Sequence, residues 1–289
     1  MTDFGNREPL ATIQNFNPAL RGIKFCGAET LRVSAFFIMI LITNDDGFYA
    51  KGIQALYKGL AEVAEVLVVA PESEQSAVGH AITLSNPLKV KRVEERGRLI
   101  GYAVNGTPAD CVKIAVTELL DHPPELVISG VNQGGNLGTC AIYSGTVSAA
   151  TEAAIMGLPA IAVSLNSFES QDFSAAVEFV KKLYPIVIKK GLPEGVSLNV
   201  NVPALPRDKI KGAVVTRQGK SRVIETFDKR VNPRNETYYW LAGEMKFDEV
   251  EKGTDCEMVA ECYISVTPIH FDLTHFKALE SLKSWNLDF

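Results

Sequence analysis

The chain has 289 residues, which is long enough to bury a large core in one or two domains. Hydrophobic residues make up 46% and charged residues 22% of it, values that are typical of an ordinary globular protein. The net charge of −5, from 29 basic and 34 acidic residues, provides no basic footprint for a nucleic-acid backbone. We therefore expect no polymeric nucleic acid among the partners.

Cysteine usage and hydropathy favour the cytoplasm. The five cysteines are odd in number and form no Cys-x-x-Cys pair, which is typical of reduced residues in a cytosolic protein. The apolar segment around Phe36–Ile42 is too short to span a bilayer, for which ~20 residues are needed. We expect a cytoplasmic protein without a membrane partner.

Residues 1–38 differ from the rest of the chain, because they show no sustained hydrophobic period. We expect them to be an extension outside the core, either a non-native start or a disordered segment. Residues 39–289 are expected to form a single domain. Within it, 39–165 would be a Rossmann-like part and 166–289 a C-terminal part that carries an oligomerisation arm.

From Met39 onward, apolar strand patterns alternate with helical patterns. The expected strands are Met39–Thr43, Val66–Ala70, Leu88–Val93, Leu99–Val104, Leu126–Ser129 and Ala160–Leu165, and the expected helices lie around 53–63, from Thr107 to Leu119, and from Ser144 or Gly145 to Gly157. This alternation predicts an α/β fold with a doubly wound, mostly parallel sheet.

The last third predicts a helix and then a β-rich region. The helix covers about Ala175–Lys190, with a kink at Pro185, and strand patterns follow at Val196–Val202, Ala213–Thr216 and within Arg222–Met245. In the last of these stretches the aromatic residues Tyr238–Trp240 follow the turn residues Asn232–Arg234. This combination favours a protruding hairpin arm used in assembly, and an ordinary strand pair of the core sheet is the alternative.

Polar side chains follow three of the predicted strands. Asp45 and Asp46 end the first strand, and two adjacent carboxylates repel each other unless a cation offsets their charge. Ser76 follows the second strand and Asn132 follows Leu126–Ser129, so one crevice at the carboxyl edge of the sheet could collect all four. This oxygen-only set suits Mg²⁺, Mn²⁺ or Ca²⁺. A solvated Asn-Asp-Asp-Gly turn is the alternative for the carboxylate pair.

A second polar group lies at the start of the helix that begins near residue 145. Ser144 and Thr146 flank Gly145 there, and the free amides of such a helix start can bind an anion without a lysine. Plain N-capping is the alternative, and it is compatible with anion binding. Histidine is scarce, and none of the four has metal-ligand spacing, so we expect them to be structural.

Seven motifs of this chain resemble those of the SurE family of survival-protein 5′-nucleotidases. They are ILITNDDG at 40–47, EQSAVGHAITL at 74–84, NGTPADCVKIA at 105–115, SGVNQGGNLG at 129–138, YSGTVSAATEAA at 143–154, YYWLAGE at 238–244 and GTDCEMVAECYISVTP at 253–268. The resemblance implies a metal-dependent phosphatase of nucleoside monophosphates with a Rossmann-like N-terminal part. It also implies homodimers or homotetramers in which the C-terminal arm swaps between subunits.

The same resemblance implies the roles of individual residues. Its metal ligands match the four residues named above, and we expect one Mg²⁺ or Mn²⁺ ion per subunit. Asp45 and Asp46 are the expected catalytic residues, with water attack and a phosphoaspartate on Asp45 both open. The expected phosphate-binding residues are Asn136, Ser144, Gly145 and Thr146.

Two further functions stay open from the sequence. The first is a phosphatase that acts mainly on short polyphosphate or other monoesters. The second is a non-catalytic module that senses nucleotides, since a fold does not fix a function.

Overall fold

The computed structural model describes residues 38–220, 222–246 and 251–287. The predicted extension therefore lies outside the described residues, apart from Ile38. The carbonyl of Ile38 accepts a hydrogen bond from the N–H of Glu65 at 3.0 Å, and its side chain packs against the core. Ile38 thus belongs to the packed chain, one residue earlier than the predicted boundary.

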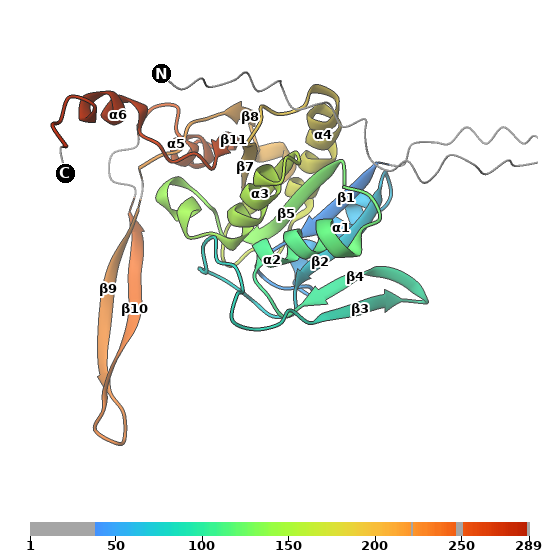
Figure 1. The fold of residues 1–289 in the computed structure, drawn as a ribbon, viewed down its shortest axis with the longest axis horizontal. Helices are drawn as coiled ribbons and strands as arrows, with labels where there is room; N and C mark the ends of the chain where they lie inside the picture. Colours follow the sequence, from blue (N-terminus) through green and yellow to red (C-terminus); the bar gives the residue numbers. More distant parts are fainter. Residues whose placement is uncertain (1–37, 221, 247–250, 288–289) are drawn as a thin grey trace, which may run out of the picture. The chain divides into compact units, whose positions relative to one another are not determined.

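A nine-stranded sheet forms the centre of the fold (Figure 1). Its strands, in spatial order, are β3 (Val90–Glu95), β4 (Arg98–Val104), β2 (Glu65–Pro71), β1 (Met39–Thr43), β5 (Leu126–Gln133), β6 (Ala160–Asn166), β7 (Val196–Pro203), β11 (Tyr263–His270) and β8 (Gly212–Val215). The six strands from β4 to β7 run parallel, and antiparallel pairs occur at β3–β4 and β7–β11. The predicted doubly wound, mostly parallel α/β sheet is confirmed.

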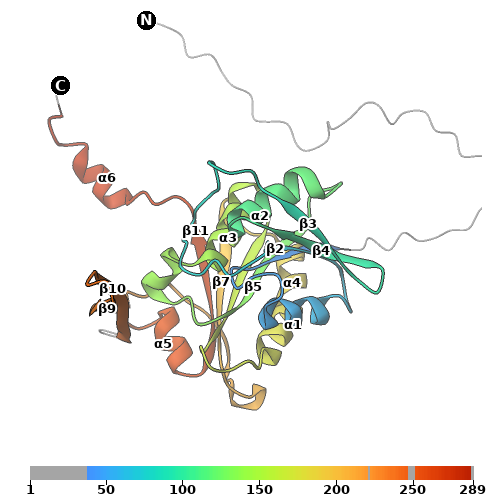
Figure 2. The same ribbon diagram turned by 90° about the horizontal axis from the view of Figure 1, so that it is seen from below.

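The helices cover both faces of this sheet (Figure 2). The helices that pack on it are α1 (Lys51–Leu60) and α4 (Ser174–Lys190) on one face and α2 (Pro108–Ile114) and α3 (Gly145–Ile155) on the other. Two further helices are α5 (Asp255–Ala260), which contacts β11, and α6 (Phe276–Leu282), which has no buried residue. Shorter turns of helix are η2 (Ala115–Leu119), η3 (Gly138–Ile142) and η4 (Arg207–Lys209).

Strand β1 shows why helices must cover both faces of the sheet. Its side chains alternate between them: Ile40 and Ile42 pack with α1 and α4, whereas Leu41 packs with α2 and α3. All three are fully buried. An apolar run without polar alternation therefore forms a strand that is buried on both sides.

The order of the strands reverses between β1 and β5. From β1 the chain proceeds outward to β2 and β4, and from β5 it proceeds in the other direction to β6 and β7. In such sheets the helices leave a crevice beyond the carboxyl ends of the two central strands, and ligands bind there. Asp45 and Asp46 lie directly after the end of β1, so the topology positions them at this crevice.

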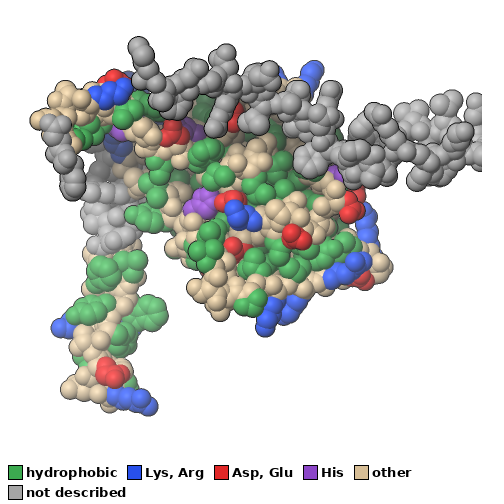
Figure 3. All heavy atoms as spheres, in the orientation of Figure 1, with side chains coloured by type: hydrophobic (Ala, Val, Ile, Leu, Met, Phe, Trp, Pro, Cys, Tyr) green, Lys and Arg blue, Asp and Glu red, His purple; other side chains and the backbone are tan. Residues whose placement is uncertain are grey.

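A separate two-stranded sheet forms the arm, which consists of β9 (Arg222–Val231) and β10 (Thr237–Lys246). The two strands pair in antiparallel register from Thr237–Val231 to Lys246–Arg222. Figure 1 shows them as a long hairpin, and Figure 3 shows hydrophobic side chains spread along it. The predicted hairpin is confirmed, and the alternative of a strand pair in the core sheet is excluded.

Candidate metal and phosphate site

Asp46 faces a cavity of about 590 Å³ at the crevice, which we call the Asp46 cavity. Its lining residues are Asp46, Tyr49, Ala50, Lys51, Gly52, Glu74, Ser76, Gln133, Phe168, Gln171 and Phe173. Two of the four predicted metal ligands, Asp46 and Ser76, therefore lie in one cavity. They come from different strand ends, as the sequence predicted.

Asp45 lies deeper than Asp46, at the start of α3. Its carboxylate accepts the N–H of Thr146 at 2.9 Å and also the hydroxyl of Thr146. Gly145 allows this approach, because a Cβ at that position would lie 2.8 Å from the Cβ of Asp45. Burial raises the pKa of Asp45, and the hydrogen bonds from Thr146 oppose that rise.

The carboxylate of Asp46 has a strongly perturbed pKa. Burial raises it to about 6, the negative charges of Asp45 and Glu74 add to the rise, and a hydrogen bond from the N–H of Gln133 at 3.2 Å opposes it. Neither Asp45 nor Asp46 forms an ion pair with any residue that the structure describes. The site therefore carries negative charge that a bound cation would neutralise.

The other two predicted ligands have oxygens that are oriented by hydrogen bonds. The hydroxyl of Ser76 donates to Oε1 of Glu74 at 2.7 Å, which leaves its oxygen lone pairs available. The amide nitrogen of Asn132 donates to the carbonyl of Gly134 at 2.7 Å, and this fixes the direction of the side-chain oxygen. Asn132 lies within β5 rather than in the loop beyond it, and it does not line the Asp46 cavity.

This donor set fits a hard divalent cation. Two carboxylates, a hydroxyl and an amide oxygen are ligands that such ions prefer, and the carboxylates are held close together without a described counter-charge. Among the described residues no cluster of three or more His, Cys, Asp and Glu side chains has metal-binding geometry. A His- or Cys-rich site for a softer metal is therefore not present in that part of the chain.

None of the predicted phosphate-binding residues lines the Asp46 cavity, and hydrogen bonds hold three of them elsewhere. Ser144 caps α3, since its hydroxyl oxygen accepts the N–H of Val147 at 3.1 Å. Asn136 is 7% exposed; its N–H donates to Asn201 at 2.7 Å and its amide nitrogen to Ser164 at 2.8 Å. Thr146 is fully buried, with both donors on Asp45. The structure thus gives Asn136 and Thr146 contacts other than the predicted ones to phosphate.

The loop that carries Ser76 is tied to α2 and α3. His80 contacts Glu152 of α3 at 2.8 Å, and Lys113 of α2 donates to the same carboxylate at 2.7 Å. The hydrogen bond from His80 and then that from Lys113 lower the pKa of Glu152. Three residues further along the loop, Thr83 donates its N–H and its hydroxyl to Asp110 of α2 at 3.0 and 2.6 Å. His80 thus links the loop of a predicted metal ligand to α3.

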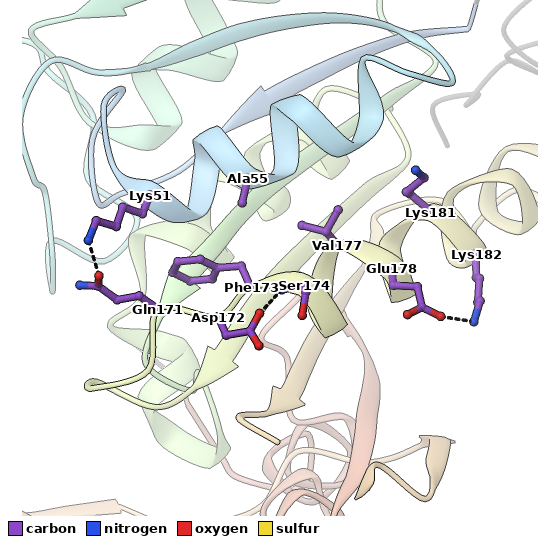
Figure 4. Close-up of a pocket in the computed structure, with 10 residues that line it drawn as sticks. All are labelled: Lys51, Ala55, Gln171, Asp172, Phe173, Ser174, Val177, Glu178, Lys181 and Lys182. Atoms are coloured by element: carbon purple, nitrogen blue, oxygen red, sulfur yellow. Dashed lines mark hydrogen bonds and ion pairs between the residues drawn. The ribbon is translucent and has the colours of Figure 1, made fainter. Parts of the chain in front are cut away.

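Lys51 and Gln171 are cavity residues that sequence reasoning missed. Lys51 begins α1 and reaches Gln171 on the segment before α4, and Figure 4 shows this contact. Both residues also line a neighbouring cavity of about 680 Å³ between α1 and α4. The sequence contained a signal for Lys51. A cation in the first turn of a helix interacts unfavourably with the helix dipole, so a lysine at that position indicates a role other than helix stability. No such signal existed for Gln171.

Comparison with known proteins identifies the family. The family model of survival protein SurE matches residues 40–225. The 5′-nucleotidase SurE of Syntrophobacter fumaroxidans is 58% identical over 248 residues, which cover 86% of this chain and 99% of the relative. That of Syntrophus aciditrophicus is 52% identical over 245 residues, 84% of this chain and 92% of the relative.

A solved structure agrees with this result. The SurE protein from Aquifex aeolicus has a TM-score of 0.75 and 42% sequence identity, and the match covers 85% of this chain and 98% of that one. Three findings agree with one another. The strand order reverses between β1 and β5, the paired carboxylates lie at that point, and the relatives match most of the chain. The chain belongs to the SurE family.

Proposed function

We propose that this protein is a metal-dependent phosphomonoesterase that hydrolyses nucleoside 5′-monophosphates to nucleoside and phosphate. The single observation that carries the proposal is the position of the Asp45–Asp46 pair at the strand reversal, with Asp46 facing a cavity that also holds Ser76 and Lys51. Relatives at 48–58% identity bear the name 5′-nucleotidase, which supports the same reaction.

The proposal includes one divalent ion per subunit, Mg²⁺ or Mn²⁺. Asp45, Asp46, Ser76 and Asn132 would hold it, since their oxygens suit a hard cation and the carboxylates lack a described counter-ion. Such an ion supplies charge neutralisation for the phosphoryl group and a water of lowered pKa.

The chain's own residues have distinct parts in this proposal. Asp46 faces the cavity, so it can orient or deprotonate the attacking water. Lys51 supplies a cation to the phosphoryl oxygens from the first turn of α1. Ser144 and Gly145 remain the proposed phosphate contacts at the start of α3. Thr146 positions Asp45, and Asn136 holds the glycine-rich loop against β6 and β7.

We further propose that the arm joins copies of this chain into a homodimer or homotetramer. A two-stranded sheet alone is marginally stable in water, and Tyr239, Trp240 and Leu241 are 58–61% exposed. A partner subunit that covers them would stabilise the hairpin.

The proposed location is the cytoplasm. Cys111, Cys140 and Cys262 are free thiols, as expected in a reducing compartment. In the described part of the chain, no helix has both the length and the apolar character that crossing a membrane requires.

A substrate panel tests the proposed reaction. Purified protein with Mn²⁺ or Mg²⁺ is given AMP, GMP, CMP, UMP, ribose 5-phosphate and tripolyphosphate, and phosphate release is measured. We expect the highest kcat/KM with a nucleoside monophosphate. Binding of nucleotides without any turnover would favour the sensing module, and a preference for tripolyphosphate would favour the polyphosphatase; either result contradicts the proposal.

A further inference from the structure

Two exposed aromatic side chains lie at the Asp46 cavity. Tyr49 is 69% exposed and Phe168 is 75% exposed, and both line the cavity together with Asp46 and Ser76. Singly scattered apolar residues on a surface need no explanation. Here, however, two rings from different elements, the loop before α1 and the loop after β6, meet at one concave site.

The ring of Phe168 is held in place by its neighbours. The carbonyl of Phe168 accepts a hydrogen bond from the side-chain amide of Gln133 at 2.6 Å. Its ring lies against Gly134, where a Cβ would come within 2.5 Å of Cε1. Gly134 has a φ of +114°, so a larger residue there would be strained as well as obstructed. The ring therefore packs against Gly134 and leaves most of its surface exposed.

Tyr49 also packs against a neighbouring residue. Its ring packs edge-on against Phe48, with ring centroids 5.2 Å apart and an interplanar angle of 66°. Phe48 is itself 1% exposed, and its N–H donates to the carbonyl of Pro71 at 2.8 Å. An exposed ring that is held by buried neighbours loses little conformational entropy when a ligand stacks on it.

The cavity is also lined by polar side chains. Lys51 and Gln171 contact each other and both line the cavity. Figure 4 shows them at the start of α1, near the ring of Phe173. Lys51 provides positive charge and Gln171 an amide that can bond to the edge of a base or to a sugar hydroxyl.

From these observations we infer that Tyr49 and Phe168 form a platform on which the nucleobase of the substrate stacks while its phosphate lies at Asp46. This inference rests on the proposed function and adds a substrate preference to it. Purine monophosphates, which have the larger stacking surface, should be better substrates than pyrimidine monophosphates. A sugar phosphate that lacks a base should be the poorest.

The first test compares AMP with ribose 5-phosphate, which carries the same reacting group without the base. The variants Phe168→Leu and Tyr49→Leu keep apolar bulk but remove the ring. Each should raise KM for AMP by about tenfold, in line with typical base–aromatic stacking, and so reduce the ratio of kcat/KM for AMP over ribose 5-phosphate by a similar factor. Phe168→Trp and Tyr49→Phe should restore the ratio.

Two controls accompany these variants. Ile186→Ala alters a half-exposed apolar residue of α4 that lines neither cavity, and it should leave both substrates unaffected. Sedimentation of Phe168→Leu should match the wild type. A changed oligomeric state would mean that the ring serves a subunit contact, which overturns the inference.

The second test uses adenosine as a probe, so that it does not depend on turnover. Calorimetric titration of adenosine into the wild-type protein should detect binding that weakens about tenfold in Phe168→Leu and recovers in Phe168→Trp. Equal affinity in wild type and Phe168→Leu, or an equal loss of kcat/KM for AMP and ribose 5-phosphate, overturns the platform. If the wild type hydrolyses neither substrate, the proposed function fails, and adenosine binding alone then decides the platform.

Discussion

Asp45 and Thr146 are 101 residues apart in the sequence, yet two hydrogen bonds join them. Oδ2 of Asp45 accepts the N–H of Thr146 at 2.9 Å, and Oδ1 accepts its hydroxyl. The first carboxylate of the acidic pair is therefore oriented by the start of α3, and α3 acts on the site through Asp45.

This contact changes the expected effect of removing the Thr146 hydroxyl. Thr146→Val keeps the shape of the side chain but leaves Oδ1 of Asp45 without its donor. Because the variant misorients a metal ligand, metal affinity and kcat/KM should both fall by about 10- to 100-fold. Mn²⁺ titration calorimetry and steady-state AMP hydrolysis measure the two quantities.

Thr146→Ser is the matched control, because it retains the hydroxyl and should stay within a few-fold of the wild type. A loss of kcat/KM in Thr146→Val with unchanged metal affinity would instead place the hydroxyl on the phosphate.

The raised pKa of Asp46 predicts a pH-dependent stability of the metal-free protein. A pKa of about 6 in the folded chain, against an ordinary value of 3.8, means that the folded state binds this proton more tightly than the unfolded state. The contribution to stability is fully present below the unfolded value and is lost as the pH rises through 6. Asp46→Asn, which imitates the protonated form, should therefore stabilise the EDTA-treated protein at pH 8.

The expected gain is about 1–2 kcal/mol at pH 8, after an allowance for the partial exposure of Asp46, and it should vanish at about pH 3, below the unfolded pKa. Urea unfolding at the two pH values measures it, with exposed Asp121→Asn as the control. An equal stability of Asp46→Asn and wild type at pH 8 would show that the carboxylate pair is not under electrostatic strain.

The arm should govern assembly. Trp240 is 60% exposed on a sheet of two strands, and it pairs across the hairpin with Asp228. Trp240→Ala should weaken self-association, because aromatic anchors often carry much of the binding energy of an interface. Sedimentation velocity over a micromolar concentration series measures this shift, with Lys229→Ala in the same hairpin as the control. A monomeric wild type in the same series would contradict the proposed assembly.

The boundary at Met39 can be tested by truncation. Deleting residues 1–38 removes the chain before β1 and also the contacts of Ile38. We expect the shortened protein to be folded and active, with a stability loss of about 1 kcal/mol for the missing hydrogen bond and packing. Thermal unfolding and AMP hydrolysis check this, and an insoluble or unfolded product would mean that residues before 39 belong to the folded unit.

The sequence predicted the sheet well because apolar runs determine which strands are buried on both faces. It predicted β5 too short: the strand continues to Gln133, with an irregular register between Ser129 and Asn132 that a glycine at 130 permits. No hydrophobic period extends through Gly130, so the continuation could not be recognised. As a result Asn132 lies within the strand.

Of the residues that line the Asp46 cavity, the sequence predicted only those that follow strand ends. Asp46 and Ser76 follow strand ends, and strand ends can be recognised from a sequence. Lys51, Gln171 and the Asp45–Thr146 contact depend on how α1, α3 and α4 pack against the sheet. Such contacts join residues 101 to 120 positions apart, and no local pattern encodes them.

The most direct test of the central claim is AMP hydrolysis by wild-type protein and Asp46→Asn, before and after EDTA treatment and on return of Mn²⁺ or Mg²⁺. We predict that EDTA abolishes phosphate release by the wild type, that metal restores it, and that Asp46→Asn stays inactive with weakened metal binding in calorimetry. Full activity of the EDTA-treated wild type, or wild-type activity of Asp46→Asn at the same metal concentration, would contradict the account.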